Sequence, residues 1–174
     1  MWPHKTGCFA LWFPKHAQLY SEAQLRMHLL DNLLRQHLPN LQFAGVTINA
    51  GPKTVCHWHR DCRNLAFGVC CIGVFGDFNY KESGQLLLKE LKLILQLAPG
   101  DLVFIPSAVI THRNMAIGQN ETRQSIVFYS AGAMFRWVAQ GHVTLGNMDE
   151  HARTALQRAS SGRWDCGWNL FQPL

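Results

Sequence analysis

The middle of the chain alternates apolar and polar residues with a period of two, and this pattern restricts the fold more than any other feature. Within residues 91–97 every odd position is Leu, and two of the three even positions are polar. Successive side chains of a β-strand point to opposite faces, so such a strand buries one face. Short segments of this kind, separated by Gly, Pro, Asn and Asp, favour a sandwich or jelly roll over a parallel α/β sheet.

The same pattern predicts where the strands lie. We expect strands at residues 42–49, 65–76, 85–97, 101–105, 110–116, 123–130 and 134–139. These segments form a β core at residues 41–141, between a helical preface at 1–40 and a helical tail at 142–174. At 174 residues, of which 48% are hydrophobic, the chain is long enough for one domain with a buried core.

Helix signals lie on both sides of the core. Ser21-Glu22-Ala23-Gln24 has the form of a capping box and predicts a helix start, and Pro39-Asn40 predicts its end. Between them an apolar stripe is formed by Leu25, Leu29, Leu30, Leu33, Leu34 and Leu38. We expect this stripe to pack on the outside of a sheet, with a partner-binding helix as the alternative. Near the end, Asp149 is expected to cap a helix through about Arg158 that residues 160–162 terminate.

Composition excludes several classes of protein. The apolar runs are too short to span a bilayer, and residues 1–5 lack the apolar stretch of a signal peptide, so we expect an intracellular protein, with the nucleus as a candidate compartment. The six cysteines form no Cys-x2-Cys pair and are interpreted as reduced. A formal charge of +5 permits a polyanionic partner, but no run of Lys or Arg exceeds two residues, so a basic surface would be assembled by folding.

Three residues have the types and spacing of an iron site. On a strand, His59 and Asp61 point to the same side while Arg60 points away, and His112 would come from a neighbouring strand. Two imidazoles and one carboxylate on one face of a metal leave the opposite positions open, as non-heme Fe(II) requires to bind a cosubstrate and O2. The rings must be neutral to bind metal, so activity should fall at acid pH.

A second pair of residues predicts the cosubstrate. Arg123 can bind a distal carboxylate through two charge-assisted hydrogen bonds, and Ser125 lies on the same strand face and can add a third. The sequence therefore predicts a dicarboxylate cosubstrate.

The stretch Cys56-His57-Trp58-His59-Arg60-Asp61-Cys62-Arg63-Asn64 resembles the metal-binding segment of the TET and base-J-type Fe(II)/2-oxoglutarate dioxygenases, which oxidise methyl groups on nucleobases. Seven further segments look like fungal, transposon-associated members of that superfamily: Ser83-Gly84-Gln85-Leu86, Leu91 to Leu97, Pro99-Gly100, Ile105-Pro106-Ser107, Thr111-His112-Arg113-Asn114, Glu121-Thr122-Arg123 and Tyr129-Ser130-Ala131-Gly132. The resemblance covers about residues 42–141.

The resemblance implies a mainly β fold with flanking helices, namely a double-stranded β-helix or cupin-like jelly roll. It implies that Fe(II) is bound by the catalytic residues His59, Asp61 and His112, and 2-oxoglutarate by Arg123 and Ser125. It further implies oxidative decarboxylation of 2-oxoglutarate coupled to hydroxylation of a methyl group on 5-methylcytosine, thymine or N6-methyladenine in DNA.

Substrate binding follows from the same resemblance. Asn64 would lie over the target base, although an Asn that forms a turn is an equally good interpretation. A base inside a duplex cannot enter a barrel, so methylated DNA would have to be single-stranded or have the base flipped out. Trp58, Phe67 and Tyr80 are candidates for stacking on it.

Two departures from the family pattern leave alternatives open. The chain has no cysteine-rich zinc-binding region, and Gln85 replaces the second glycine often seen in the Ser-Gly-Gly segment. A protein or small-molecule hydroxylase is therefore one alternative.

Another alternative is a cupin-type metalloprotein that binds its metal through His57, His59 and His112. The spacing from Gly51 to the His57-Trp58-His59 segment and from Gly100 to His112 resembles the two cupin motifs, but the expected Glu is missing and a cupin has no use for Arg123. A jelly-roll interaction domain without catalytic activity is the third alternative.

Overall fold

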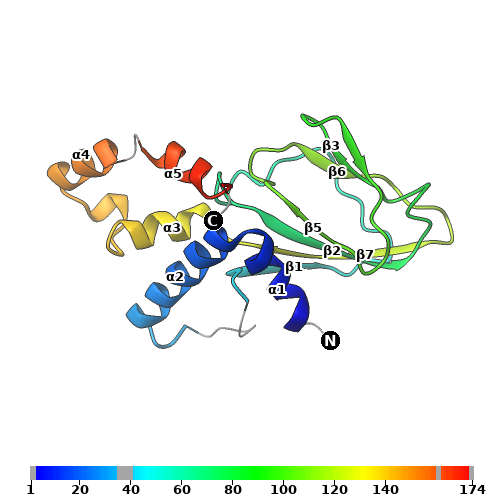
Figure 1. The fold of residues 1–174 in the computed structure, drawn as a ribbon, viewed down its shortest axis with the longest axis horizontal. Coiled ribbons are helices and arrows are strands. Elements are labelled where there is room, and N and C mark those ends of the chain that lie inside the picture. The colour runs from blue at the N-terminus through cyan, green and yellow to red at the C-terminus, as the bar shows by residue number, and fades with distance from the viewer. Residues whose placement is uncertain (1–2, 35–40, 160–161, 173–174) are drawn as a thin grey trace. The chain divides into compact units, whose positions relative to one another are not determined.

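The computed structural model describes residues 3–34, 41–159 and 162–172 (Figure 1). It divides into two units, each described here by itself. Gly45–Ser130 carries all the strands named below, and Met1–Ala44 together with Ala131–Leu174 forms a helical unit.

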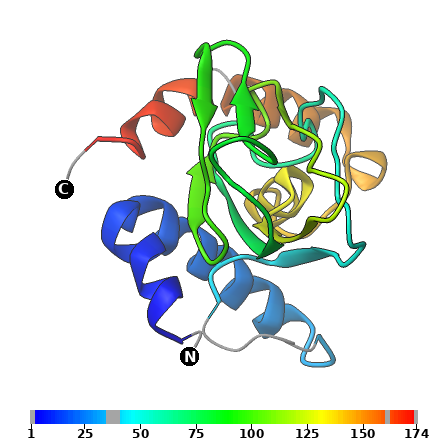
Figure 2. The ribbon, with the colours of Figure 1, turned by 90° about the vertical axis from the view of Figure 1, so that its right-hand side faces the viewer.

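The strand unit consists of two antiparallel sheets. The first has the order β1 (Gly45–Asn49), β7 (Thr122–Tyr129), β2 (Cys70–Asp77) and β5 (Leu102–Ile105). The second has the order β4 (Leu93–Leu95), β3 (Leu86–Leu88) and β6 (His112–Asn114). In Figures 1 and 2 the β3–β4 hairpin, in green, lies on the opposite side of this unit from β1, in cyan.

The path of the chain between the sheets makes this unit a jelly roll. The chain passes from β2 in the first sheet to β3 and β4 in the second, back to β5, across to β6 and back to β7. The segment at His59 adds to the free edge of the second sheet through an antiparallel bridge to His112. The expected fold class, mainly β with flanking helices in a jelly roll, is confirmed.

The core fills the space between the sheets. Its buried residues come from β2, β3 and β5 and include Cys70, Val74, Leu86 and Ile105. All six cysteines are free, and burial raises the pKa of the Cys70 thiol to about 12, so this side chain behaves as a small apolar group.

Several predicted strands have other bounds. The segment 85–97 is two short strands, β3 and β4, joined through a turn in which Lys92 has a φ of 53°. Its repeated leucines are only partly buried, because Leu91 and Leu93 remain about half exposed while Leu95 and Leu97 pack on the core. The segment around His59 and Asp61 is not a strand but one bridge followed by a turn.

The prediction of a strand at residues 134–139 was wrong, because this segment belongs to helix α3 (Gly132–Ala139). Six residues are too few to distinguish a period of two from a helical period. In the helix, Phe135 packs on Tyr20, with ring centroids 5.1 Å apart, and this contact within the helical unit favours the helix.

The other helical elements are α1 (Pro3–Trp12), α2 (Pro14–Leu30), a 3-10 turn at Leu145–Asn147, α4 (Glu150–Ala159) and α5 (Arg163–Asn169). The predicted cap of α4 is confirmed, because Asp149 Oδ1 accepts a hydrogen bond from the backbone N–H of Ala152 at 2.7 Å. Residues 160–161, the expected stop, lie outside the described residues. Among the helices described, none is both long and apolar enough to cross a membrane.

Helix α2 begins at Pro14, well before the predicted start at Ser21, and ends at Leu30. Its buried face carries Tyr20, whose ring packs with Phe9 at 5.4 Å and Phe43 at 5.6 Å. The predicted leucine stripe is on the other face, with Leu29 78% exposed. Aromatic packing within the helical unit therefore sets the rotation of this helix, and the expected packing of the stripe on a sheet stays a prediction. Leu38 and Pro39-Asn40 lie outside the described residues.

One carboxylate ties together the loops at the β2–β3 and β6–β7 connections. Glu121 accepts hydrogen bonds from the Ser83 hydroxyl at 2.6 Å and from the backbone N–H groups of Asn79 at 2.7 Å and Gly118 at 2.5 Å. These bonds, led by that of Ser83, lower the pKa of Glu121 because they favour the charged form.

We predict that Glu121→Gln destabilises the protein at neutral pH and that this difference disappears in acid. A carboxyl group whose pKa is lowered by folding stabilises the native state above its ordinary pKa of about 4.3, and this contribution is lost as pH falls through the lowered value. Urea unfolding at a series of pH values measures the effect. Glu82→Gln, an exposed residue of the same loop region, should show little difference at any pH, and a constant Glu121→Gln deficit down to pH 2 would contradict the assignment.

Candidate metal centre

The structure brings His59, Asp61 and His112 together at the open edge of the second sheet. One ligand atom from each residue lies within 4.8 Å of the other two, and this is the one such group of three found in the part of the chain that the structure describes. The His59 Nε2 atom is 3.7 Å from Asp61 Oδ1, and the centroids of the two imidazole rings are 4.3 Å apart. This geometry can hold a metal ion.

Two backbone hydrogen bonds set the distance between the histidines. The N–H of His59 donates to the carbonyl of His112 at 3.1 Å, and the N–H of His112 donates to the carbonyl of His59 at 2.9 Å. This reciprocal pair makes the two residues direct partners across an antiparallel bridge, with their side chains on the same face. The irregular segment thereby has the same fixed position beside β6 that a full strand would have.

Hydrogen bonds also select the ligand nitrogen of each ring. His59 Nδ1 lies 2.7 Å from the carbonyl oxygen of His57, and His112 Nδ1 lies 2.9 Å from that of Ile110. A carbonyl only accepts, so each Nδ1 carries the proton and each Nε2 has a free lone pair. Such partners behind ligating histidines orient the rings and fix their tautomers. The chemistry of the donor set therefore fits a divalent transition metal.

Asp61 is held by a turn and not by a strand. Its N–H donates to the carbonyl of Ser107 at 2.9 Å, and its carbonyl accepts from the N–H of Asn64 at 2.8 Å. The Asn64 side chain then donates to the Ser107 hydroxyl at 3.2 Å. Ser107 is 2% exposed and thus anchors both ends of the turn. Asn64 forms the turn, as one interpretation predicted, and lines the cavity described below, while its contact with a target base stays a prediction.

The two histidines differ in their surroundings. His112 is 4% exposed, and burial lowers its pKa because the charged imidazolium is poorly solvated there. The side chains of His59 and Asp61 are 41% and 31% exposed. The inner ligand is therefore kept neutral, while the other two border solvent.

A cavity of about 290 Å³ extends from these three residues between the sheets. Polar residues on its wall include Asn49, Asn64, Asn114, Arg123 and Ser125, and Ile72, Leu86 and Val127 form its apolar part. The volume suits a small organic acid better than a whole nucleoside with its phosphate.

Arg123 is the most unusual residue of this cavity. It is 3% exposed, its Nε has no hydrogen-bond partner, and its guanidinium forms no ion pair within residues 3–34, 41–159 and 162–172. Burial lowers its pKa, as expected for a cation taken out of water. A buried charge without a partner is strongly unfavourable, and a bound carboxylate would relieve this cost.

The backbone around Arg123 is fixed from two sides. Its N–H donates to the carbonyl of Pro52 at 2.6 Å, and its carbonyl accepts from the N–H of Thr54 at 3.1 Å. On the other side it pairs with Gly76, whose φ is 120° and where a Cβ would lie 2.2 Å from the carbonyl oxygen of Thr122. Glycine is needed here so that β2 can approach β7 at the arginine.

Ser125 lies on the same buried face of β7, as the alternation predicts. Its Oγ accepts a hydrogen bond from the Asn49 side chain at 3.0 Å. The hydroxyl proton then remains available to donate to a ligand. The structure thus brings all five predicted metal and cosubstrate residues, together with Asn64, to one cavity.

Asn114 was missed by the sequence analysis. It is 5% exposed, and it accepts from the N–H of Cys56 at 2.8 Å and donates to the carbonyl of Thr54 at 2.9 Å. It therefore fastens the segment that leads to His59 onto β6. Its position two residues after His112, on the same strand face, was the signal available in the sequence.

The other candidate residues lie elsewhere. The side chain of His57 is exposed and outside the metal-ligating group, so the cupin-type set of three histidines is not assembled. Tyr80 packs against the core and Phe67 is half-buried. Trp58 is 44% exposed and lies over the guanidinium of Arg113.

No family model matches the chain, and no curated protein is similar to it in sequence. Among solved structures, NgTET1 in complex with 5mC DNA is 19% identical over 66% of this chain and 51% of that one, with a TM-score of 0.46. A cupin-2 domain containing protein from Shewanella frigidimarina is 16% identical over 61% of this chain and 97% of that one, with a TM-score of 0.30. The chain thus spans about half the length of the first structure. At these values neither similarity transfers a function.

We predict that Arg123→Met stabilises the protein in the absence of ligands. Replacing a buried charge by an apolar group of similar volume removes its desolvation penalty and should raise the free energy of unfolding by about 1–4 kcal/mol. Urea unfolding at pH 7 measures this. Arg63→Met, at an exposed site, should change stability by no more than about 0.5 kcal/mol. A loss of stability in Arg123→Met would mean that the guanidinium has a partner within the protein.

Proposed function

We propose that this chain is an Fe(II)- and 2-oxoglutarate-dependent dioxygenase that hydroxylates a methyl group on a nucleobase of DNA. The observation that carries the proposal is the buried, unpaired Arg123 in the same cavity as His59, Asp61 and His112. A metal-binding group alone fits many metalloproteins. A metal-binding group beside a buried cation without a partner fits a reaction that needs an organic acid next to the metal.

Each residue has a defined task in this proposal. The Nε2 atoms of His59 and His112 and one carboxylate oxygen of Asp61 would hold the iron, and three such ligands would leave room for a cosubstrate and O2. The Arg123 guanidinium and the Ser125 hydroxyl bind the distal carboxylate of 2-oxoglutarate. When bound, iron would activate O2, one oxygen atom of which would oxidise 2-oxoglutarate to succinate and CO2 while the other would hydroxylate a C–H bond of the substrate.

The surroundings of these residues support the same chemistry. The hydrogen bonds of both Nδ1 atoms keep the rings from turning, so the ligand set is preorganised before metal binds. Apolar side chains such as Ile72 and Val127 line the cavity and limit the access of water to the reacting centre.

The choice of a nucleobase as substrate is supported by one resemblance, one side chain and the net charge. Segment 56–64 resembles the metal-binding segment of enzymes that oxidise methyl groups on nucleobases. Asn64 lines the cavity, and its amide presents a donor and an acceptor that suit a base edge. The net charge of +5 suits a polyanionic substrate. The base would have to be flipped out or single-stranded to approach the iron.

We predict that Fe(II) and 2-oxoglutarate together give a weak visible charge-transfer band under anaerobic conditions. Asp61→Ala should abolish the band because it removes the single anionic ligand, whereas His57→Ala should retain it. The two substitutions form a matched pair, since a cupin-type site would respond in the opposite way. Retention of the band in Asp61→Ala together with its loss in His57→Ala would replace our ligand set by the cupin one.

The same band measures the cosubstrate site. In Arg123→Met the concentration of 2-oxoglutarate needed to develop half of the band should rise by about tenfold or more, since a charge-assisted hydrogen bond contributes about 1.5–3 kcal/mol. An unchanged affinity would remove Arg123 from the proposed mechanism.

We predict that methylated single-stranded oligonucleotides stimulate release of succinate from 2-oxoglutarate above the rate without substrate. Unmethylated oligonucleotides are the matched controls, and mass spectrometry of the nucleosides after incubation identifies the oxidised base. Asn64→Ala should reduce the stimulated rate and retain the charge-transfer band. If no oligonucleotide stimulates turnover while the band is present, the substrate is a protein or a small molecule and the nucleobase assignment is wrong.

A further inference from the structure

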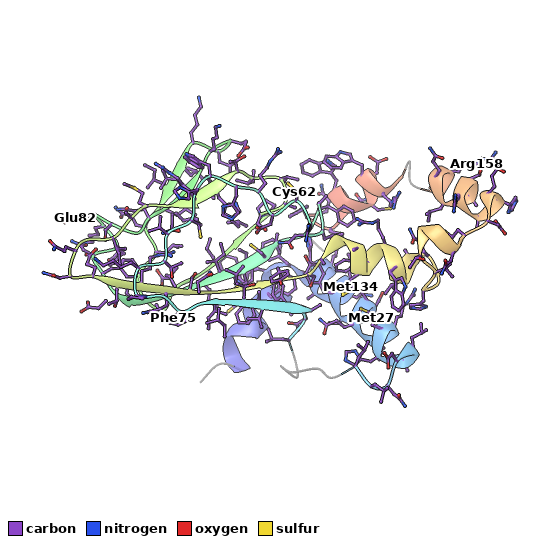
Figure 3. The ribbon with its side chains drawn as sticks, turned by 180° about the vertical axis from the view of Figure 1, so that it is seen from behind. Met27, Cys62, Phe75, Glu82, Met134 and Arg158 are labelled. Atoms are coloured by element: carbon purple, nitrogen blue, oxygen red, sulfur yellow. The ribbon has the colours of Figure 1, made fainter. Side chains whose placement is uncertain are left out.

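The cavity opens to solvent at the segment that carries two of the proposed metal ligands. The side chains of His59 and Asp61 are 41% and 31% exposed, whereas His112 and Arg123, deeper in the cavity, are 4% and 3% exposed. Cys62, in the turn after Asp61, lies at the opposite end of the strand unit from Glu82 in Figure 3. Residues 57–63, of which all but Asp61 are exposed, therefore form a rim at this side of the cavity.

The rim carries a tryptophan that has no role in the core. Trp58 precedes His59, and its indole packs on the guanidinium of Arg113, the residue that follows His112 on β6. The side chain is 44% exposed. Its ring is therefore accessible from solvent next to a proposed metal ligand.

The indole is part of a stacked pair. The guanidinium carbon of Arg113 lies 4.7 Å from the centroid of the Trp58 ring, within the range of a cation–π interaction. Arg113 follows His112 on β6, so the strand that carries one proposed ligand supports the ring next to another. The Nε of Arg113 is buried without a hydrogen-bond partner. The pair therefore presents a fixed aromatic surface, with a cation behind it, at the edge of the cavity.

Cations lie on the same rim. Arg60 and Arg63 are exposed, and in the described residues neither forms an ion pair with a carboxylate. The nearby Glu90 carboxylate is already occupied by the N–H and the hydroxyl of Thr111, at 2.7 and 2.5 Å. An exposed aromatic ring with exposed arginines in the same segment suits single-stranded nucleic acid, where bases stack on rings and phosphates contact cations.

We propose that Trp58, stacked on Arg113, together with Arg60 and Arg63 forms a rim strip that binds the nucleotide next to the one whose base enters the cavity. The inference rests on the proposed function, because it assumes that the substrate is a nucleic acid. Trp58 stacks on the neighbouring base and holds the strand open beside the metal. Arg60 and Arg63 contact the phosphates that flank it. The strip distinguishes single-stranded from duplex nucleic acid but not one base sequence from another, since every base has a face that stacks on an aromatic ring.

Fluorescence anisotropy of a labelled, methylated single-stranded oligonucleotide tests the strip in the full chain. Trp58→Ala should raise Kd by about tenfold or more, and Trp58→Phe should restore part of the affinity because it keeps a ring. Trp12→Ala, at a tryptophan that is 71% exposed in the helical unit, is the matched control and should leave Kd unchanged. Arg60→Gln and Arg63→Gln should each reduce the slope of log Kd against log salt by about one.

The charge-transfer band of Fe(II) and 2-oxoglutarate separates failure of the strip from failure of the proposed function. Trp58→Ala should keep the band, because the indole packs on Arg113 and Trp58 is not one of the three proposed metal ligands. Equal Kd values for wild type and Trp58→Ala, or a wild type that binds no oligonucleotide, would overturn the strip and leave the band as evidence for the dioxygenase. Loss of the band in Trp58→Ala would also overturn it, since Trp58 would then position His59. If Trp58→Ala raises Kd as expected but the wild type gives no band, the strip stands and the dioxygenase assignment is overturned.

Discussion

The reciprocal pair of backbone hydrogen bonds between His59 and His112 is the interaction on which the site depends. The chain from residue 50 to 69 contains no continuous strand, so without this bridge nothing in the sheet ladders would place His59 or Asp61. The bridge is reinforced on one side by Asn114, which binds the backbone at Thr54 and Cys56, and on the other by Ser107, which binds the turn after Asp61. Side-chain amides and hydroxyls thus fix this irregular segment in place as firmly as strand pairing would. Because the backbone at Asp61 is not part of a strand ladder, it can turn so that the carboxylate faces the histidines.

Arg123 shows how stability and function oppose each other in this cavity. A guanidinium buried between two sheets with no carboxylate beside it destabilises the fold. The strand that carries it is an inner strand of the first sheet, paired with β2 from Thr122 to Phe128 and with β1 from Ser125 to Tyr129, and Arg123 itself also forms a bridge with Lys53. Backbone pairing on both sides therefore holds the residue that most needs a ligand.

The sequence was sufficient wherever local alternation decided the outcome. Arg123 and Ser125 share the buried face of β7 because a strand of this length has two fixed faces, and the cap at Asp149 follows from one side chain and its own backbone. Prediction from the sequence failed where contacts between residues far apart in the chain determine the structure. Residues 134–139 are helical, with Phe135 packed on Tyr20. Asn114 was not found because its partners lie 58 and 60 residues away in the chain.

Both proposed histidine ligands obtain their tautomer in the same way, from the carbonyl oxygen two residues earlier in the chain. This contact is local, and it needs no acidic partner behind the ring. The two rings differ in burial, since the His59 side chain is 41% exposed and His112 is 4% exposed. Burial lowers the pKa of His112, so near neutral pH this nitrogen holds no proton that a metal ion would have to displace. The buried wall of the cavity therefore favours a neutral His112, while His59 and Asp61 at the rim remain accessible from solvent. Under the proposed function, a metal ion and a substrate would thus approach from the same side.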